Sequence, residues 1–590
     1  MAFRFWFLSI LASSLFAEIP IFPLKDVHPG LHGIGKTIFT GNRIEDFDVE
    51  VLGVLEDLGP KQSIILARLS GGPLAEAGVM QGMSGSPVYI DGRLVGAVAL
   101  AFAYAREPIA GIRPIEEMLR AGEQTRKQIE VQPSALVHSP LFRAAMTTAP
   151  PGAYSDAAPS DRMTPIETPI SFSGFSAATL THFAPQLRSL GLEPRQGLSS
   201  GGHLPPGMGP PGQLRPGDMI TVQLLSGDMS VGADGTVTAV DGKRVFAFGH
   251  QFLAVGGTEL PFARAEVITV LPSVQSSFKI SSAREWMGAI TQDRNTAIYG
   301  ELGRHAATIP LAIDIAGQRG TLSRYRMQMV SDQILSPFLL QMAIYSAIET
   351  TERTLGAGTF VVSGKAQFNG PVAPLRFDNT YSGDFSVPQQ ASLGVASSLA
   401  YIMSAGFDAL RLKDIDVSIT AVEQKRSLEI DQISASEKYV RPGQTIDIAV
   451  TLSGPNGMEI VKKAKFHAPV GIPVGALQLT ASDAMTTNLL DYGGAIGVTP
   501  KSPSQAVSLI NDLRPNTKAY VRVWTTEPAY QVQGADIPDP PPSLGLILAR
   551  TQTAPGTVAV ARGSKLADIE IDVGPYVVTG SKSIQVEVRE

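Results

Sequence analysis

Residues 82–87 read GMSGSP, a stretch in which two serines alternate with glycines. A serine hydroxyl becomes a useful nucleophile when a base takes its proton and backbone N–H groups hold the developing oxyanion. Glycines permit the sharp turn that points successive N–H groups into one concavity. If Ser84 is the nucleophile, the N–H groups of Gly82 and Ser84 are the natural oxyanion donors. The six residues alone also suit a structural turn, so the rest of the chain must decide.

The chain contains eight histidines that could take the serine proton. His250 follows a glycine at the end of a strand-like run, where a hydrogen-bonded turn histidine would also fit. His28 and His32 are rival bases, because they lie in the same predicted unit as Ser84. The positions of these histidines in the sequence do not decide which of them is the base.

A carboxylate that orients the imidazole makes such a site faster. Asp293, in the stretch TQDRN, follows His250 and is the first candidate, although an aspartate in such a stretch also suits a turn. Asp234, Asp46 and Asp48 are the alternatives.

The sequence around GMSGSP resembles the serine region of the SpoIVB-type serine peptidases, which cut their targets outside the cytoplasmic membrane. The resemblance rests on GMSGSP, on the hairpin that follows it, on GIRPIEEML at residues 111–119 and on EDFDVEVLGVL at residues 45–55. More remotely, GMSGSP is similar to the GDSGGP region of the chymotrypsin-like clan. The resemblance implies that Ser84 is the nucleophile. The strand predicted over residues 94–100 would then pair with the backbone of a bound peptide.

A second resemblance to the same family surrounds His250. VGADGTVTAVDGKRVFAFGHQF at residues 231–252 is similar to the stretch that carries the family's catalytic histidine, which implies that His250 is the base. The order of the pieces is reversed, because the family has its histidine half first. Here the serine half, residues 18–125, precedes the histidine half, residues 215–310. We expect a permuted arrangement in which the two halves dock, since catalysis depends on geometry and not on chain order.

The sequence departs from the family at the orienting aspartate. The family has an aspartate a short distance before the serine, whereas this chain has Leu69 and Ser70 there, with Glu76 nearby. An orienting aspartate can be worth up to about 10⁴ in rate. Its absence would leave a slow enzyme or an inactive relative.

These residues must be positioned by a mainly β protein. Runs rich in Val, Ile and Leu, punctuated by Gly, Pro and Asp, predict many short strands, and the length of 590 residues predicts several domains. We expect chymotrypsin-like double β-barrel halves in permuted order, an α+β middle region with apolar helices at residues 336–353 and 387–406, and a C-terminal β-sandwich-like domain. The predicted segments are a signal peptide (1–17), a serine-bearing β-barrel half (18–125), a linker with a small strand–helix insert (126–214), a histidine-bearing β-barrel half (215–310), an α+β region (311–424), an Ig-like β-sandwich (425–485) and a C-terminal α+β region (486–590).

The composition and the N-terminal sequence indicate which classes of partner and which cellular compartment to expect. A net charge of −6 without a basic patch argues against nucleic acid, and the lack of cysteine excludes disulfides and thiolate metal sites. No metal-binding motif is present, so we expect no metal and no cofactor. Arg4, an apolar run and small residues up to Ala17 are typical of a cleaved signal peptide. No later run reaches the roughly 20 apolar residues that cross a bilayer. We therefore expect export to the bacterial envelope, periplasmic or extracellular, with no integral membrane span after signal removal.

Two functions follow from these observations. The first is an exported SpoIVB-like serine endopeptidase that cleaves protein or peptide substrates by Ser/His nucleophilic catalysis. The second is a catalytically inactive, peptidase-like envelope protein that acts as a peptide-binding or assembly module with an envelope protein partner. The serine and histidine stretches favour the enzyme, and the missing aspartate and the large C-terminal half favour the second function.

Overall fold

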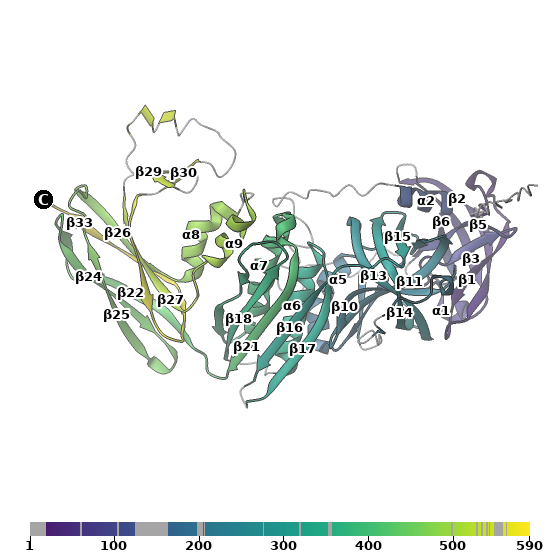
Figure 1. Cartoon of the computed structure of the whole chain (residues 1–590), viewed down its shortest axis with the longest axis horizontal. Coiled ribbons are helices and arrows are strands. Elements are labelled where there is room, and N and C mark those ends of the chain that lie inside the picture. Colours follow the sequence, from purple (N-terminus) through teal and green to yellow (C-terminus); the bar gives the residue numbers. More distant parts are fainter. Residues whose placement is uncertain are drawn as a thin grey trace, which may run out of the picture.

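The computed structural model is elongated, with the N-terminal barrels at one end and a C-terminal sandwich at the other (Figure 1). The predicted signal peptide and most of the predicted linker lie outside the described residues. The structure describes residues 19–59, 62–102, 105–123, 163–196, 204–205, 207–274, 276–317, 320–351, 357–496, 500–526, 529–532, 535–537, 541, 543–544, 546–547, 558–561 and 563–590.

The first unit is a closed ring of six antiparallel strands, in the order β4-β1-β2-β3-β6-β5, with β5 pairing back to β4. Alternating apolar side chains fill its interior, as in β3, where Ile65, Ala67 and Leu69 are buried. Its strands are β1 (His32–Ile38), β2 (Ile44–Gly59), β3 (Gln62–Ser70), β4 (Pro87–Ile90), β5 (Arg93–Phe102) and β6 (Ile109–Pro114), with helices α1 (Leu74–Ala77) and α2 (Ile115–Glu123).

The second unit is another closed ring of six strands, in the order β10-β13-β14-β15-β12-β11, with β11 pairing back to β10. Its strands are β10 (Met219–Gly227), β11 (Ser230–Asp241), β12 (Arg244–Ala247), β13 (Gly256–Leu271), β14 (Phe278–Arg294) and β15 (Ala297–Leu302). The chain is therefore mainly β, and its two barrels confirm the chymotrypsin-like double-barrel architecture, with the serine-bearing barrel first.

The described part of the predicted linker joins both barrels. β7 (Met163–Pro165) pairs with β5 of the first barrel, and β8 (Thr168–Ser173) pairs with β11 of the second. Helix α5 (Ala177–Ser189) then leads to β9 (Leu192–Gln196), which runs parallel to β8. The predicted strand–helix insert is thus built into the barrel sheets.

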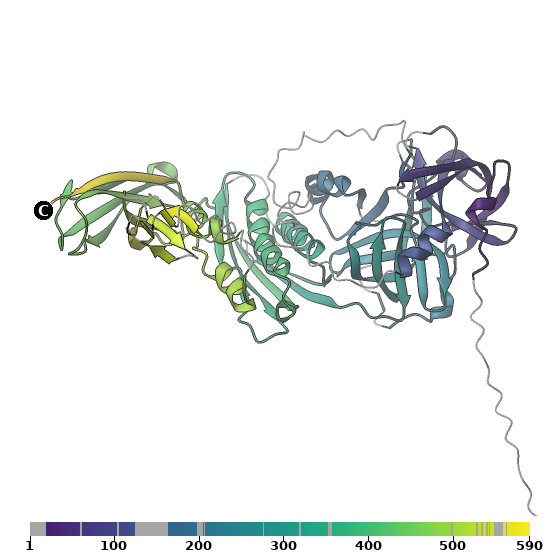
Figure 2. The same cartoon turned by 90° about the horizontal axis from the view of Figure 1, so that it is seen from above.

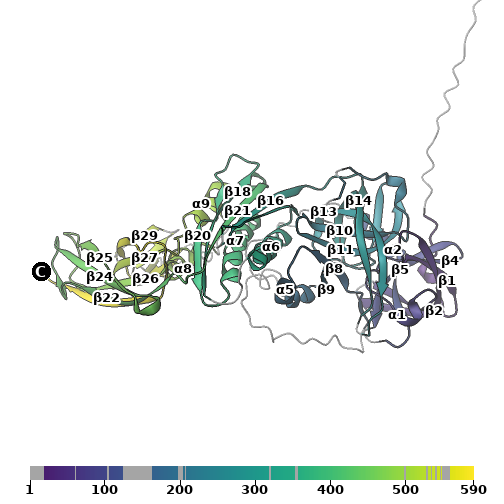
Figure 3. The same cartoon turned by 90° about the horizontal axis from the view of Figure 1, so that it is seen from below.

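The middle region extends the sheet of the second barrel, because β17 pairs with β10. The two apolar helices predicted from sequence are confirmed as α6 (Leu335–Thr351) and α7 (Val387–Ser404), which pack side by side against this sheet (Figure 2, Figure 3). The strands are β16 (Thr308–Ala316), β17 (Leu322–Val330), β18 (Gly358–Phe368), β19 (Leu375–Arg376), β20 (Asn379–Gly383) and β21 (Leu412–Val422).

The C-terminal sandwich draws on two stretches of chain. The three longer strands of residues 427–467 form one sheet together with β32, and the facing sheet combines the short β23 and β26 with strands beyond residue 517. Strands from residues 486–590 therefore complete the sandwich predicted for residues 425–485. The two sheets are made of β25 (Glu459–His467), β24 (Thr445–Ser453), β22 (Ser427–Ala435) and β32 (Val577–Thr579), and of β23 (Tyr439–Val440), β33 (Ser581–Val588), β26 (Gly475–Ser482), β27 (Lys518–Thr525) and β31 (Lys565–Asp572).

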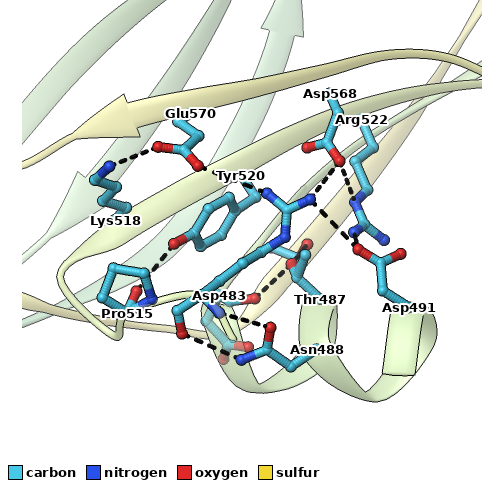
Figure 4. A network of polar contacts seen from close by, with 12 residues as sticks. Asp483, Thr487, Asn488, Asp491, Pro515, Lys518, Tyr520, Arg522, Asp568 and Glu570 are labelled. Carbon is cyan, nitrogen blue, oxygen red and sulfur yellow. Dashed lines mark hydrogen bonds and ion pairs between the residues drawn. The ribbon is translucent and has the colours of Figure 1, made fainter. Parts of the chain in front are cut away.

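An ion-pair network around one buried arginine ties a helix to this sandwich (Figure 4). Arg522 of β27 is 1% exposed and is paired with Asp491, which comes from helix α8 (Ala484–Ile496). Arg514 bonds to Asp491 and to Asp568 of β31. Paired burial of this kind is what a guanidinium needs inside a protein. The other elements here are α9 (Pro503–Asn511), the small sheet β28 (Ala529–Val532), β29 (Ala535–Ile537) and β30 (Val558–Ala561), and, elsewhere in the chain, short 3₁₀ turns at Leu24–Asp26, Pro211–Gln213, Asp408–Leu410 and Pro455–Gly457. Among the described residues, no helix is both long and apolar enough to cross a bilayer.

Candidate active site

The GMSGSP turn lies between α1 and β4 and is tightly hydrogen-bonded. The N–H of Met83 donates to the carbonyl of Met80 at 3.1 Å, and the N–H of Ser86 donates to the carbonyl of Met83 at 2.9 Å. Gly82 and Gly85 have φ values of 88° and 93°, a region that glycine adopts without strain. Ser84 therefore lies in a turn whose shape depends on the glycine on each side of it.

The turn docks directly against the second barrel. Thr236 of β11 donates from its N–H to the carbonyl of Ser84 and from Oγ1 to the carbonyl of Gly82, both at 2.8 Å. Thr238 donates from Oγ1 to the carbonyl of Gly85 at 2.7 Å. A Cβ built on Gly85 would lie 2.0 Å from the carbonyl oxygen of Thr236. The permuted halves thus meet at the predicted serine turn.

His250 follows β12 in a turn that contacts the first barrel. Gly249, with a φ of 71°, lies so close to β5 that an added Cβ would be 3.4 Å from the carbonyl oxygen of Val98. The same Val98 carbonyl accepts a hydrogen bond from the N–H of Gly85 at 2.8 Å. Ser84 and His250 are therefore each one residue away from a glycine that lies beside Val98 of β5.

The imidazole of His250 is held in one tautomer. Nδ1 lies 2.6 Å from the carbonyl oxygen of Gln251, which can only accept, so Nδ1 carries the proton and Nε2 presents its lone pair. Burial lowers the pKa of His250 to about 4, against the opposing effect of the Gln251 bond, and the Arg113 guanidinium lowers it further. At neutral pH His250 is therefore an uncharged base.

Four polar groups at this junction have no hydrogen-bond partner within the described ranges. They are Oγ of Ser84, Nε2 of His250 and the N–H groups of Gly82 and Ser84. The N–H groups of Met83, Gly85 and Ser86, in contrast, are all bonded. A buried polar group without a partner costs about 1–3 kcal/mol, and other buried side chains of this structure, such as Ser230 and Gln341, also have one. The unpaired groups at the junction are those that acyl transfer by a serine requires.

The junction is closed in this conformation. Ser84 is 0% exposed and His250 is 3% exposed, and no hydrogen bond joins their side chains. A cavity of about 220 Å³ lies elsewhere, between the second barrel and the middle sheet, lined by residues that include Gln223, Trp286 and His305. A peptide would therefore reach Ser84 only after a movement of the turn or of the barrels.

The expected pairing of β5 with substrate is wrong for this conformation. The predicted strand over residues 94–100 forms part of β5, which pairs with β6 on one side and with β4 and β7 on the other. Both edges of the strand are already occupied.

Asp293 supports the histidine loop. Its carboxylate accepts hydrogen bonds from the N–H groups of Phe252 at 2.8 Å, Leu253 at 2.7 Å and Val255 at 3.3 Å. These contacts fix the backbone that follows His250, whereas the imidazole itself is oriented by the Gln251 carbonyl. Asp293 thus supports the loop that follows His250 and makes no hydrogen bond to the imidazole itself.

The other sequence candidates lie away from this junction. Asp234 is buried inside the second barrel, where it accepts hydrogen bonds from Thr221 and Ser171. Asp46 and Asp48 are exposed, and so are the rival bases His28 and His32. Among the described residues, no group of three or more metal-ligating side chains is gathered together.

Two residues contribute to the junction although no sequence motif marks them as part of a site. Lys279 of β14 is 2% exposed, and its Nζ lies 2.6 Å from Oγ1 of Thr37 in β1. Ser86 donates to the same Thr37 oxygen at 3.0 Å. Lys279 and Thr37 stand in ordinary strand sequences, so a local pattern could not have identified them.

Comparison with known families finds one match. Residues 10–119, which include the serine turn and most of the first barrel, match the family described as SpoIVB peptidase S55. Comparisons with curated proteins and with solved structures find no match. The resemblance seen at GMSGSP is confirmed: this part of the chain is similar to a serine peptidase family.

Proposed function

We propose that this protein is an exported serine endopeptidase in which Ser84 and His250, from opposite barrels, form one site. The observation that carries the proposal is the set of unpaired groups at the barrel junction, with a nucleophile, a base and two N–H donors left free while their neighbours are bonded. The peptidase family match of residues 10–119 supports the same reaction class.

Each group has a defined task in this mechanism. Nε2 of His250 takes the proton of Ser84, and Oγ attacks the carbonyl carbon of the substrate peptide bond. The N–H groups of Gly82 and Ser84 stabilise the oxyanion. The imidazolium then gives its proton to the leaving amine, and the acyl-enzyme is hydrolysed by water with His250 again as base. The Gln251 carbonyl holds Nδ1–H throughout.

The arrangement predicts slow turnover. A carbonyl dipole on Nδ1 stabilises an imidazolium less than a carboxylate does, and the charge of Arg113 opposes its formation. The missing orienting carboxylate therefore lowers the rate without removing the base.

The compartment and the partners belong to the same proposal. The signal-like residues 1–17 favour export to the bacterial envelope, where a protein or peptide would be the substrate. The C-terminal sandwich is free to recruit an envelope protein partner.

A second candidate is an inactive relative that uses the paired barrels as a peptide-binding or assembly module. The observation that favours it is the closed junction, in which Ser84 is fully buried and the imidazole of His250 bonds to a backbone carbonyl and to no carboxylate among the described residues.

Covalent labelling separates the two candidates. A fluorophosphonate reacts when Ser84 attacks phosphorus, fluoride leaves, and His250 accepts the serine proton. We expect one label on the full chain, mapped to Ser84 by peptide mass spectrometry, and a labelling rate lowered about 10³-fold in His250→Ala, the middle of the range for loss of a general base. Ser70→Ala, an exposed serine at the end of β3, is the matched control and should label normally. Absence of label on Ser84, or equal labelling without His250, would support the inactive relative.

A further inference from the structure

Lys279 is a buried amine at the barrel junction that the mechanism above does not use. It is 2% exposed, and its Nζ lies 2.6 Å from Oγ1 of Thr37, which also accepts a hydrogen bond from Oγ of Ser86 at 3.0 Å. Ser86 belongs to the catalytic turn, Thr37 to β1 and Lys279 to the second barrel. The three side chains thus form a chain of hydrogen bonds across the interface.

Hydrogen-bond accounting favours the uncharged amine. Nζ of Lys279 donates to Oγ1 of Thr37, and among the described residues it contacts no second acceptor, whereas an ammonium has three donors to satisfy. A neutral amine makes the same bond to Thr37 and leaves fewer hydrogens without an acceptor, so Oγ1 of Thr37 accepts from both Lys279 and Ser86. Burial also lowers the pKa of Lys279 to about 7.

Among the described residues no carboxylate bonds to Nζ of Lys279, and the ionisable groups on the elements packed around it are engaged elsewhere or exposed. They are Asp234 with Thr221 and Ser171, Lys36 with Asp46, Asp218 with Arg215, Glu259 with Arg304, Arg264 with Glu285, Glu266 with Arg284, Glu167 and Arg195 with Gln81, Arg294 with Gln292, Asp293 with the loop after His250, and the exposed His32.

Lys279 supports the serine turn at three points. Its N–H donates to the carbonyl of Gln81 at 3.1 Å. Its Cβ and Cδ lie 3.4 Å from the position of a Cβ built on Gly82, so its alkyl chain packs beneath one oxyanion donor. Its Nζ reaches Ser86, at the other end of the turn, through Thr37.

We infer that uncharged Lys279 is a positioning residue for the peptidase site, which holds the oxyanion-binding turn through Thr37 and Ser86 and releases it when protonated. This inference rests on the proposed peptidase. A proton on Nζ places a charge without a countercharge in the buried interface, which favours separation of the two barrels at this point, so the turn loses its anchor at Ser86. The role is distinct from that of His250, which exchanges a proton with the reacting serine.

The pH profile of labelling tests this role. If Lys279 must be neutral, Ser84 labelling in the wild-type chain rises tenfold or more as the pH rises through about 7, well above the pKa near 4 of His250. Lys279→Met keeps the alkyl packing and cannot be protonated, so its labelling should change less than twofold over the same range. Lys243→Met, an exposed lysine in the β11–β12 turn, should keep the wild-type profile. A wild-type profile in Lys279→Met would overturn the inference.

Thr37 provides a second test with a conservative rescue. Thr37→Val keeps the shape but removes the link, and we expect at least a tenfold lower labelling rate, whereas Thr37→Ser should label at the wild-type rate. If Thr37→Val labels as fast as the wild type, the link has no positioning role.

Hydrogen exchange separates a failure of this inference from a failure of the peptidase proposal. In Ser84→Ala, which cannot label, protection of the bonded N–H groups of Met83, Gly85 and Ser86 should rise as the pH rises through about 7, after correction for intrinsic exchange. The same amides in Lys279→Met/Ser84→Ala should show protection that does not change with pH. Equal behaviour of the two chains would overturn the role of Lys279 whether or not Ser84 is reactive.

Discussion

Replacing His250 with alanine is expected to lower kcat/KM for a casein-derived peptide by about 10³-fold, because removal of a general base costs about 10²–10⁴. His250 presents an unpaired Nε2 at the buried junction with Ser84, and its pKa of about 4 keeps it uncharged at neutral pH. Ser84→Ala should lose at least as much. The double variant should be no slower than Ser84→Ala alone, since residues that act as a unit are not additive.

The rival bases give the matched controls for this prediction. His28 and His32 are exposed on the first barrel, so His28→Ala and His32→Ala should keep wild-type kcat/KM. Initial rates measured at substrate concentrations well below KM give the comparison directly. Losses that multiply in the double variant, or an unaffected His250→Ala, would contradict a shared site.

Replacing Gly85 with alanine is expected to destabilise the barrel junction by more than about 4 kcal/mol, a size reached by few single substitutions. The new Cβ would lie 2.0 Å from the carbonyl oxygen of Thr236 and 2.5 Å from the N–H nitrogen of Phe248, and both are backbone atoms that cannot move aside cheaply. The φ of 93° at Gly85 adds backbone strain. Ser84 labelling should fall with the docking, because the same contacts place the serine.

Gly92 separates the two causes. It also has a positive φ, 72°, but a Cβ there meets nothing within 4 Å. Gly92→Ala should therefore cost only the backbone strain, about 1–3 kcal/mol. Hydrogen exchange of the β11 and β4 peptides measures both effects locally, which suits a chain of several domains. A Gly85→Ala chain with the exchange and labelling of Gly92→Ala would show that the turn is not clamped between the barrels.

The local sequence predicted the serine turn and the histidine turn because glycines and alternating apolar residues report backbone conformation directly. GMSGSP and the stretch that ends at His250 are both turns beside strands, as expected. The two apolar helices of the middle region were predicted from their spacing for the same reason.

The contacts between these segments could not be read from local sequence. Thr236 clamps Gly82 and Ser84 from a strand far along the chain, and nothing in its neighbourhood marks it for that task. The C-terminal sandwich shows the same limit. Its strand β22 pairs in parallel with β32, which lies far along the chain, so that Ser427 is paired with Val577. Non-local pairing depends on the whole fold, whereas sequence patterns report short-range structure.

The spacing of Asp293 from His250 predicted that the two residues lie near each other but did not predict which groups the carboxylate bonds to. Asp293 lies near His250 in the fold, yet it bonds to three backbone N–H groups of the following loop. Gln251 orients the ring through its backbone carbonyl. Every residue type has this group, so the sequence cannot identify it. Lys279 was missed because a single buried lysine in a strand resembles any other lysine in the sequence.

The central claim is that Ser84 and His250 form one site across the barrel junction, and a crystal structure of the full chain after reaction with a fluorophosphonate tests it most directly. We expect phosphorus bonded to Oγ of Ser84, the phosphonyl oxygen about 3 Å from the N–H groups of Gly82 and Ser84, and Nε2 of His250 within hydrogen-bond reach of the adduct. An adduct on another residue, or one on Ser84 with His250 out of reach and the N–H groups turned away, would contradict the account.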